Sequence, residues 1–193
     1  MSYNWQQHVP DVAQQFIPDK ICTSKSKCNG TDKDEFLVGN SNANTIDGKG
    51  GNDAIAGDGG NDTLIGGSGN DHLAGDLGRN KLSGNGGKDK FFFQLKDGKT
   101  GYSLITDYEN GDKIVVKGKI YKNMKATKQG KDTLLTYKGK DMALIRNASV
   151  SKNDIINQDK KDVIFPTPRL SEDNNNEAWQ IESYAFLPVN DLV

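Results

Sequence analysis

Hydrophobic residues are scarce in this sequence, at 34% of 193 residues, and no apolar run approaches the roughly 20 residues of a membrane-spanning helix. The opening stretch MSYNWQQHVPDVAQQ lacks the charged start and the apolar run of a cleaved signal peptide. We therefore expect a soluble chain with no membrane span and no single large apolar core. Any export would use a route other than a cleaved N-terminal signal.

Catalytic and zinc-binding motifs are also missing. The sequence contains neither HExxH nor GxSxG, two widespread hydrolase signatures, and we predict that the chain is not an enzyme. The two histidines, His8 and His72, are too few for a cluster. Cys22 and Cys28 are too few for a four-cysteine zinc site and leave two alternatives open, a small-loop disulfide or two free thiols.

Charge is segregated along the chain, although the net charge is only −1. Residues 30–87 hold nine acids against four bases, and residues 88–140 hold thirteen lysines against six acids. Residues 153–193 return to an excess of acid, with eight acids against three bases. Because acidic segments flank the basic one and no reader motif occurs, we expect no nucleic-acid partner.

Glycine recurs with a strict period of nine, at positions 30, 39, 48, 57, 66, 75 and 84. Counted from each of these glycines, the eighth residue is always large and apolar: Leu37, Ile46, Ile55, Leu64, Leu73, Leu82 and Phe91. A flexible glycine-rich linker would have no reason to place a large side chain at a fixed position. The sequence also lacks the DxDxDG loop of an EF-hand. We therefore expect seven structural repeats between residues 30 and 92.

Each nine-residue unit divides into about six residues of turn and three of strand. The strand points its middle residue inward, so the eighth positions form one apolar column, and His72 at a seventh position faces out. At the second position, Asn40, Asp58, Asp76 and Asn85 are the non-glycine types that best tolerate a positive φ. The pattern predicts an all-β chain.

These units resemble the GGxGxDxUx repeat of RTX (hemolysin-type) calcium-binding proteins. The resemblance implies a parallel β-roll in which two turns on the same edge, one full coil apart, hold each Ca²⁺. On one edge, here named the first edge, the sixth positions are Glu35, Asp53, Asp71 and Asp89, and on the second edge they are Asn44, Asp62 and Asn80.

The resemblance assigns these sixth-position side chains as calcium ligands, together with backbone carbonyls of the turns. The expected carbonyl donors are Gly48, Gly50, Gly51, Gly57, Gly59, Gly60, Gly66, Gly67, Ser68, Gly69, Gly84, Gly86 and Gly87. Several calcium ions are implied, and we expect the second edge to bind more weakly because amides replace two of its carboxylates. The acids would repel one another in a metal-free roll, so binding and folding are expected to be coupled.

Residues 93–156 predict a cap of short antiparallel strands on the roll, and ITDYENGDKIVV is similar to the segment after the repeats in secreted proteases and alginate-modifying enzymes of the family. Asp107 and Asp112 match acidic positions there, and are interpreted either as surface turn residues, which we favour, or as ligands of a last calcium. The lysines of the cap are interpreted either as a solubilising surface, which we favour, or as a face that binds an anionic polysaccharide or a cell surface.

Residues 1–29 form an N-terminal segment with the cysteine pair, and residues 157–193 form an acidic tail. The ending Asp191, Leu192 and Val193 is similar to the uncleaved C-terminal signal of type I secretion. The resemblance thus implies a bacterial, secreted, extracellular module that folds on binding calcium. A calcium-dependent adhesin or an accessory module for acidic polysaccharides is the alternative function.

Overall fold

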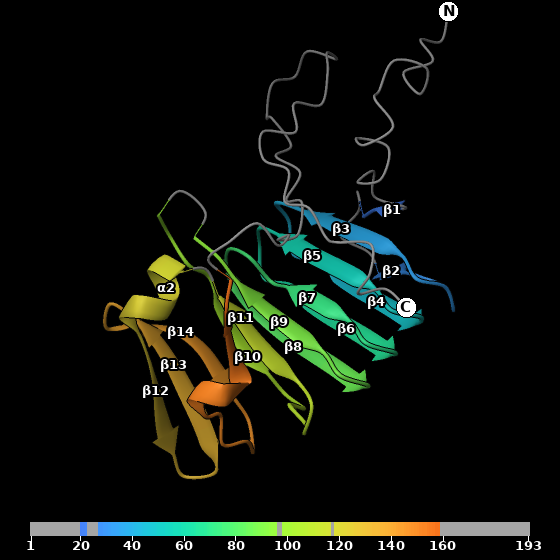
Figure 1. The fold of residues 1–193 in the computed structure, drawn as a ribbon. Coiled ribbons are helices and arrows are strands. Elements are labelled where there is room, and N and C mark those ends of the chain that lie inside the picture. Colours follow the sequence, from blue (N-terminus) through green and yellow to red (C-terminus); the bar gives the residue numbers. More distant parts are fainter. Residues whose placement is uncertain (1–19, 23–26, 96–97, 117, 159–193) are drawn as a thin grey trace, which may run out of the picture.

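The computed structural model describes residues 20–22, 27–95, 98–116 and 118–158, and in this part the chain winds into a parallel β-roll (Figure 1). The two sheets face each other, and the chain alternates between them along the repeats. The all-β, parallel β-roll architecture is therefore confirmed. No helix of the described residues is long and apolar enough to cross a membrane.

The first sheet is built from odd-numbered strands. In spatial order it contains β1 (Lys20–Ile21), β3 (Phe36–Asn40), β5 (Ala54–Asp58), β7 (His72–Ala74), β9 (Lys90–Phe93), β11 (Lys113–Val116) and β15 (Ile155–Asn157). The second sheet contains β12 (Met124–Gln129), β13 (Asp132–Tyr137), β14 (Lys140–Ile145), β10 (Tyr102–Ile105), β8 (Arg79–Gly86), β6 (Thr63–Ser68), β4 (Thr45–Gly50) and β2 (Lys27–Asn29). A short helix, α2 (Gly118–Asn123), and a 3₁₀ turn, η2 (Lys152–Asp154), lie in the cap.

Neighbouring strands of the roll are in register 18 residues apart, as in the pairs Leu37 with Ile55 and Ile46 with Leu64. Two nonapeptides therefore make one coil. Strands β4, β6 and β8 of the second sheet are longer than three residues, because extended backbone continues into the first turn positions. Gly50 thus pairs with Ser68, and Ser68 with Gly86.

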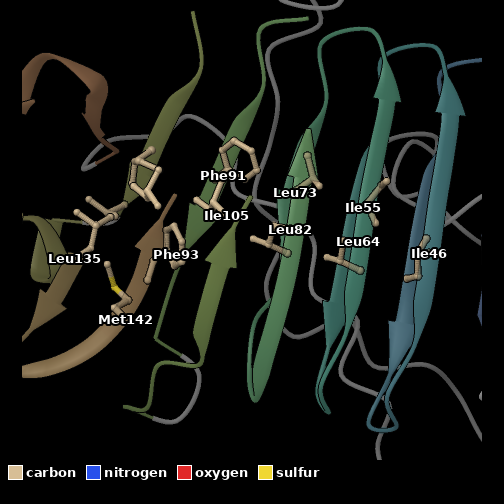
Figure 2. Packing of buried hydrophobic residues seen from close by; sticks show 14 of the residues in the cluster. Ile46, Ile55, Leu64, Leu73, Leu82, Phe91, Phe93, Ile105, Leu135 and Met142 are labelled. Atoms are coloured by element: carbon tan, nitrogen blue, oxygen red, sulfur yellow. The ribbon is translucent and has the colours of Figure 1, made fainter. Parts of the chain in front are cut away.

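The eighth-position side chains form the expected interior column (Figure 2). Seven residues have no exposed surface: Leu37, Ile46, Ile55, Leu64, Leu73, Leu82 and Phe91. The prediction from the period of nine is confirmed at each of these positions. The column continues into the cap through Ile105, Ile114, Leu135 and Met142, which close the core at that end.

The cap differs in part from a set of antiparallel strands. β10, β11 and β15 continue the two sheets in parallel, and only β12 with β13 and β13 with β14 are antiparallel. The register between Leu82 and Ile105 and between Phe91 and Ile114 is 23 residues rather than 18, because these coils have longer connections. The roll thus extends past its glycine repeats.

His72 lies on the outer side of the first sheet, as expected, but its side chain is not fully solvated. Its ring is partly buried on β7 and lies 5.3 Å from the ring of Phe92, with an interplanar angle of 57°. Burial, with a smaller contribution from Lys90, lowers the pKa of His72 to about 4. The side chain is therefore neutral at pH 7 and packs as an aromatic group on the outer side of the first sheet.

At the other end of the roll, Cys22 and Cys28 are joined in a disulfide, with their Cα atoms 5.7 Å apart. Cys22 follows β1 of the first sheet and Cys28 lies in β2 of the second, so the bond links the two sheets. Both residues belong to the buried core. The tail beyond Gln158, with its expected secretion signal, lies outside the described residues.

Candidate calcium-binding turns

The sixth-position side chains form a ladder of hydrogen bonds along each edge. In each case one side-chain oxygen, Oδ1, accepts the backbone N–H of the sixth-position residue one coil earlier. The donor and acceptor pairs are Glu35 to Asp53 (2.9 Å), Asp53 to Asp71 (2.8 Å), Asp71 to Asp89 (2.8 Å), Asn44 to Asp62 (2.8 Å) and Asp62 to Asn80 (2.9 Å). This bond holds each side chain inside the turn and sets where its second atom points.

The second carboxylate oxygen, Oδ2, has no hydrogen-bond partner in Asp62, Asp71 and Asp89, which we call the three site aspartates. At most 1% of the surface of each of these residues is exposed. No ion pair among the described residues reaches them. Asp47 is different, because its buried carboxylate has Lys27 and Lys49 as counterions, each at 2.9 Å. Within the described residues, then, no side chain supplies a counter-cation to the three site aspartates, as a buried carboxylate requires when it is ionised.

The first-position glycines complete a cradle of oxygen atoms. A Cβ added to Gly66 would collide with Oδ2 of Asp71 and would lie 2.8 Å from the backbone carbonyl oxygen of Gly84, one coil away. A carboxylate oxygen and a carbonyl oxygen thus border the same small space. Gly57 has the same surroundings, with Asp62 and the carbonyl of Gly75.

This donor set fits calcium. Ca²⁺ prefers six to eight oxygen ligands from carboxylates and backbone carbonyls. No group of three His, Cys, Asp or Glu side chains gathers around one point in the described residues, so backbone carbonyls would have to supply much of each shell. The three site aspartates would hold the ion with carbonyls of the glycine turns, and the ion would supply the positive charge that their buried oxygens lack.

Burial raises the pKa of each site aspartate well above its ordinary value of 3.8. The pKa of Asp62 rises to about 7 and that of Asp71 to about 6, and neighbouring carboxylates add to the effect. The pKa of Asp89 rises to about 7, with Asp112, Asp71 and Asp107 contributing after burial. In a metal-free roll these carboxylates therefore hold their protons up to a higher pH. A divalent cation would displace those protons.

The turn backbone explains why the glycines and short polar residues are there. Positive φ occurs at the second position in Lys49, Asp58, Asp76 and Asn85, and at the fourth position in Gly51, Gly60, Gly69, Gly78 and Gly87. Asp58, Asp76 and Asn85 were expected in this conformation. Asn40 does not adopt it, and Lys49 does although lysine is a poor residue for it.

Three of the expected ligands differ from the three site aspartates in their hydrogen bonds, although the oxygens of Glu35 and Asn44 also border a first-position glycine. Oε2 of Glu35 accepts the backbone N–H of Thr31 at 2.5 Å, and Oδ1 of Asn44 accepts that of Asn40 at 2.9 Å. Asn80 donates from Nδ2 to the carbonyl of Gly75 at 2.8 Å. Each of these side chains is hydrogen-bonded within its own repeat without a cation.

The fifth-position side chains form a second ladder that sequence reasoning missed. Oδ1 of Asn52 accepts the backbone N–H of Asn70, Oδ1 of Asn70 accepts that of Lys88, and Oδ1 of Asn61 accepts that of Arg79, all at 2.8 Å. The available signal was the Asn-Asp pair at residues 52–53, 61–62 and 70–71. The fifth and sixth positions thus bond in opposite directions along the roll.

Asp107 and Asp112 follow the last glycine repeat, and the carboxylates of both accept backbone N–H groups. Oδ1 of Asp112 accepts from Asp89 at 2.9 Å and Oδ2 accepts from Glu109 at 2.8 Å. Asp107 accepts from the N–H groups of Gly84 and Asn85. Asp112 therefore occupies the next place in the first-edge ladder, but an N–H group already binds its second oxygen.

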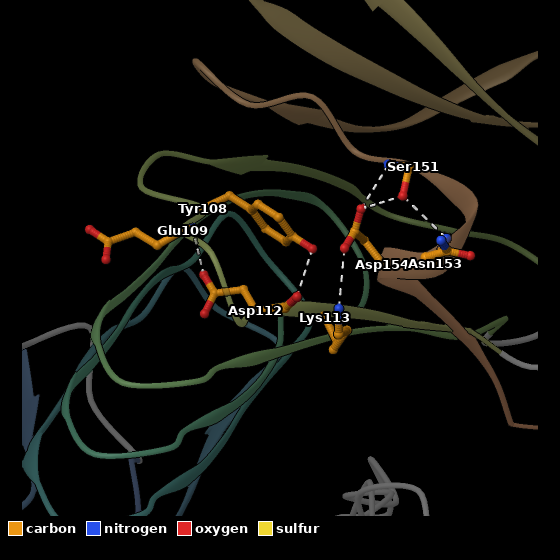
Figure 3. A network of polar contacts seen from close by, with 7 residues as sticks. All are labelled: Tyr108, Glu109, Asp112, Lys113, Ser151, Asn153 and Asp154. Carbon is orange, nitrogen blue, oxygen red and sulfur yellow. Dashed lines mark hydrogen bonds and ion pairs between the residues drawn. The ribbon is translucent and has the colours of Figure 1, made fainter.

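Figure 3 shows the polar network that holds this end of the cap. The Tyr108 hydroxyl donates to the backbone carbonyl of Asp112 at 2.8 Å, and Lys113 pairs with Asp154 at 3.1 Å. Asp154 also accepts from the hydroxyl of Ser151 at 2.6 Å and forms a capping box with it. These contacts join the segment after β10 to η2, so they fix the turn that carries Asp112.

Replacing Gly66 with alanine is expected to weaken calcium binding several-fold, because the new Cβ would enter the space beside Oδ2 of Asp71. Gly86→Ala is the matched control, since a Cβ there would meet no atom within 4 Å and Gly86 has no positive φ. Calcium titration calorimetry measures both. Equal affinities for the two variants would contradict the proposed cradle.

Comparison with known proteins identifies the repeats. The matching family model describes an RTX calcium-binding nonapeptide repeat (4 copies) and covers residues 29–64 and 65–93. A solved structure, the extracellular lipase LipA from Serratia marcescens, is similar at 13% identity with a TM-score of 0.25. That match covers 69% of this chain and 40% of the lipase chain, so the chain spans less than half of the lipase. The comparison with curated proteins finds no match.

The repeat match and the geometry of the turns lead to the same ion. The period, the buried column and the oxygen-lined turns lie in the residues that the family model covers. Residues 29–93 of this chain are RTX calcium-binding nonapeptide repeats, and Ca²⁺ is the ion that such repeats bind.

Proposed function

We propose that this chain is a secreted module that stays unfolded where calcium is scarce and folds when it meets extracellular calcium. The observation that carries the proposal is the set of three site aspartates, each with a buried Oδ2 that makes no hydrogen bond and no ion pair within the described residues. Calcium binding and folding would then be one event, because the two turns of each site come together only in the coiled chain.

The physical reason is the cost of buried charge. An ionised carboxylate that is buried without a partner destabilises a fold by roughly several kcal/mol, even after the surrounding protein has relaxed around it. Asp71 and Asp89 follow each other on the first edge, and neighbouring carboxylates add to the burial that raises the pKa of both. A Ca²⁺ ion removes both the repulsion and the desolvation cost, and extracellular modules bind it with dissociation constants of about 10⁻⁴–10⁻³ M.

Secretion is the part of the proposal that rests on the sequence. The RTX repeat favours type I export, the route that the family resemblance implies. The low calcium of the cytosol would keep the roll unfolded for passage. In this proposal the chain acts through calcium and its own folded shape, without catalysis, and the lipase activity belongs to the compared protein.

The alternative partner, an anionic polysaccharide or a cell surface, rested on the lysine-rich cap. Exposed lysines lie on β12, which is an edge strand of the second sheet, for example Lys125 and Lys128. No contact among the described residues selects a polysaccharide, and a solubilising surface explains the same lysines. We therefore keep calcium as the proposed partner.

Limited proteolysis at two buffered calcium concentrations tests the proposal. At free calcium of about 10⁻⁷ M, below the range of extracellular modules, the repeats should be cut rapidly, and at about 10⁻³ M they should be protected. Mass spectrometry would locate the cuts within residues 30–93, with magnesium as the control ion. Equal protection of the repeats at both calcium concentrations would show that folding does not depend on calcium.

A further inference from the structure

Asn80 is in the sixth position of its repeat, on the second edge, and is buried with 3% of its surface exposed. Its Oδ1 accepts the backbone N–H of Asp62 at 2.9 Å, just as Oδ1 of Asp71 accepts that of Asp53 at 2.8 Å. The side chain of Asn80 therefore lies in the turn in the same way as those of the three site aspartates.

The second atom of the side chain makes the difference. In the three site aspartates this atom is an oxygen without a hydrogen bond. In Asn80 it is Nδ2, which donates to the backbone carbonyl of Gly75 at 2.8 Å. The orientation of the amide follows from its partners, because a flipped amide would turn an N–H toward the N–H of Asp62 and an oxygen toward the carbonyl of Gly75.

We infer that the side-chain amide of Asn80 takes the place of a calcium ion on the second edge. Its amide N–H supplies the partial positive charge that the Gly75 carbonyl would otherwise receive from a cation. A calcium ion at this place would meet an N–H donor instead of an oxygen ligand. The inference deepens the proposed function and rests on calcium being the ion of the remaining turns.

The same substitution makes the two edges unequal. On the first edge Asp53, Asp71 and Asp89 follow one another, whereas on the second edge Asp62 lies between two asparagines. Asn44 is also bonded within its own repeat, where its Oδ1 accepts from Asn40. On the second edge, hydrogen bonds within the repeat thus hold two of the three sixth-position side chains and only Asp62 calls for a cation, so the calcium response is concentrated on the first edge.

Asn80→Asp tests this inference, since it changes one atom type and preserves the shape of the side chain. The variant keeps an acceptor for the Asp62 N–H and replaces the donor to the Gly75 carbonyl with an oxygen, so its second carboxylate oxygen would lack a hydrogen bond, as in the three site aspartates. We expect it to bind about one more calcium per chain than wild type and to unfold at a lower temperature in chelator. Equilibrium dialysis with metal analysis gives the number of ions. Thermal unfolding in chelator gives the stability, with a stabilising osmolyte present to fold the calcium-free chain.

Asn61→Asp is the matched control. It adds the same charge to a turn on the same edge, one coil earlier, but Asn61 is exposed and its Oδ1, which accepts from Arg79 at 2.8 Å, is preserved as a carboxylate oxygen. Asp62→Asn is the reciprocal variant, and is expected to lose calcium and to gain stability in chelator. It also keeps the test decisive if Asn80→Asp does not fold.

Two results would overturn the inference. One is an Asn80→Asp chain with the calcium number of wild type, and the other is an Asp62→Asn chain that is less stable than wild type in chelator. Failure of the proposed function would look different, because wild type itself would then bind no calcium, while the chelator stabilities would still measure the Asn80 amide bond.

Discussion

Replacing Asp71 with alanine is expected to raise the calcium concentration at the midpoint of folding about a hundredfold. Two calcium-binding pairs of turns share this side chain, and each is expected to contribute about tenfold. Asp71 is the middle carboxylate of the first edge, with Asp53 one coil before it and Asp89 one coil after it. Alanine removes the buried Oδ2 and also leaves the N–H of Asp53 without its acceptor.

Circular dichroism at increasing calcium measures this midpoint. Asp32→Ala is the control, because it removes the same charge from an exposed turn residue of the roll. We expect its midpoint to stay within a factor of two or so of wild type, as for other surface substitutions. A small shift in the midpoint for Asp71→Ala, similar to that of the control, would show that Asp71 does not bind the ion that folds the chain.

At pH 6, where protonation of the site aspartates favours the folded calcium-free chain, calcium binding should release protons, and at pH 8.5 it should release few or none. The pKa of Asp62 and Asp89 in the metal-free roll is about 7 and that of Asp71 about 6, raised first by burial. Because these values lie above the ordinary 3.8, protonation favours the metal-free folded state. This contribution to stability is fully present below about pH 3.8 and is lost as the pH rises through 6 to 7.

Two measurements check the sign of this linkage. Calorimetry in two buffers with different ionisation enthalpies counts the protons released per chain, and we expect more than one at pH 6. The calcium affinity should fall by about tenfold per site aspartate for each pH unit below the pKa of that group. In chelator, the β signal should increase on acidification from pH 8 to pH 5. Proton release that is equal at pH 6 and pH 8.5 would contradict the burial of these carboxylates in the calcium-free roll.

The period of nine predicted the parts of the fold that depend on repetition. A large residue at a fixed position in each unit forms one buried column when the strands of a coil stack in register. Leu64 and Leu73 were therefore assigned to the interior correctly. The same register placed the sixth positions on two edges. These features follow from backbone geometry and hydrophobic burial, which a pattern of residue types encodes directly.

The continuation of the roll beyond Phe92 was not predictable in the same way. β10 pairs with β8 and β11 with β9 after longer connections, so the glycine period disappears although the parallel pairing persists. His72 shows a second limit. The alternation of a strand indicates which side a residue is on, but not that Phe92 lies beside it on the same side of the sheet.

The detail of the turns also needed coordinates. The sequence indicates that Asp62 and Asn80 occupy equivalent positions, and it predicts a weaker site where an amide replaces a carboxylate. It does not indicate that Nδ2 of Asn80 reaches the carbonyl of Gly75, which changes the role of this residue from a poor ligand to a replacement for the ion. The fifth-position ladder of Asn52, Asn61 and Asn70 was missed because asparagine in a turn has many local hydrogen-bonding possibilities.

A calcium titration of the purified, chelator-treated chain, followed by circular dichroism with magnesium as the control ion, tests the central claim most directly. The account predicts a cooperative gain of β signal at calcium of roughly 10⁻⁴–10⁻³ M and no such gain with magnesium. A chain that is already folded in chelator at pH 8, and whose spectrum does not change with calcium, would contradict it.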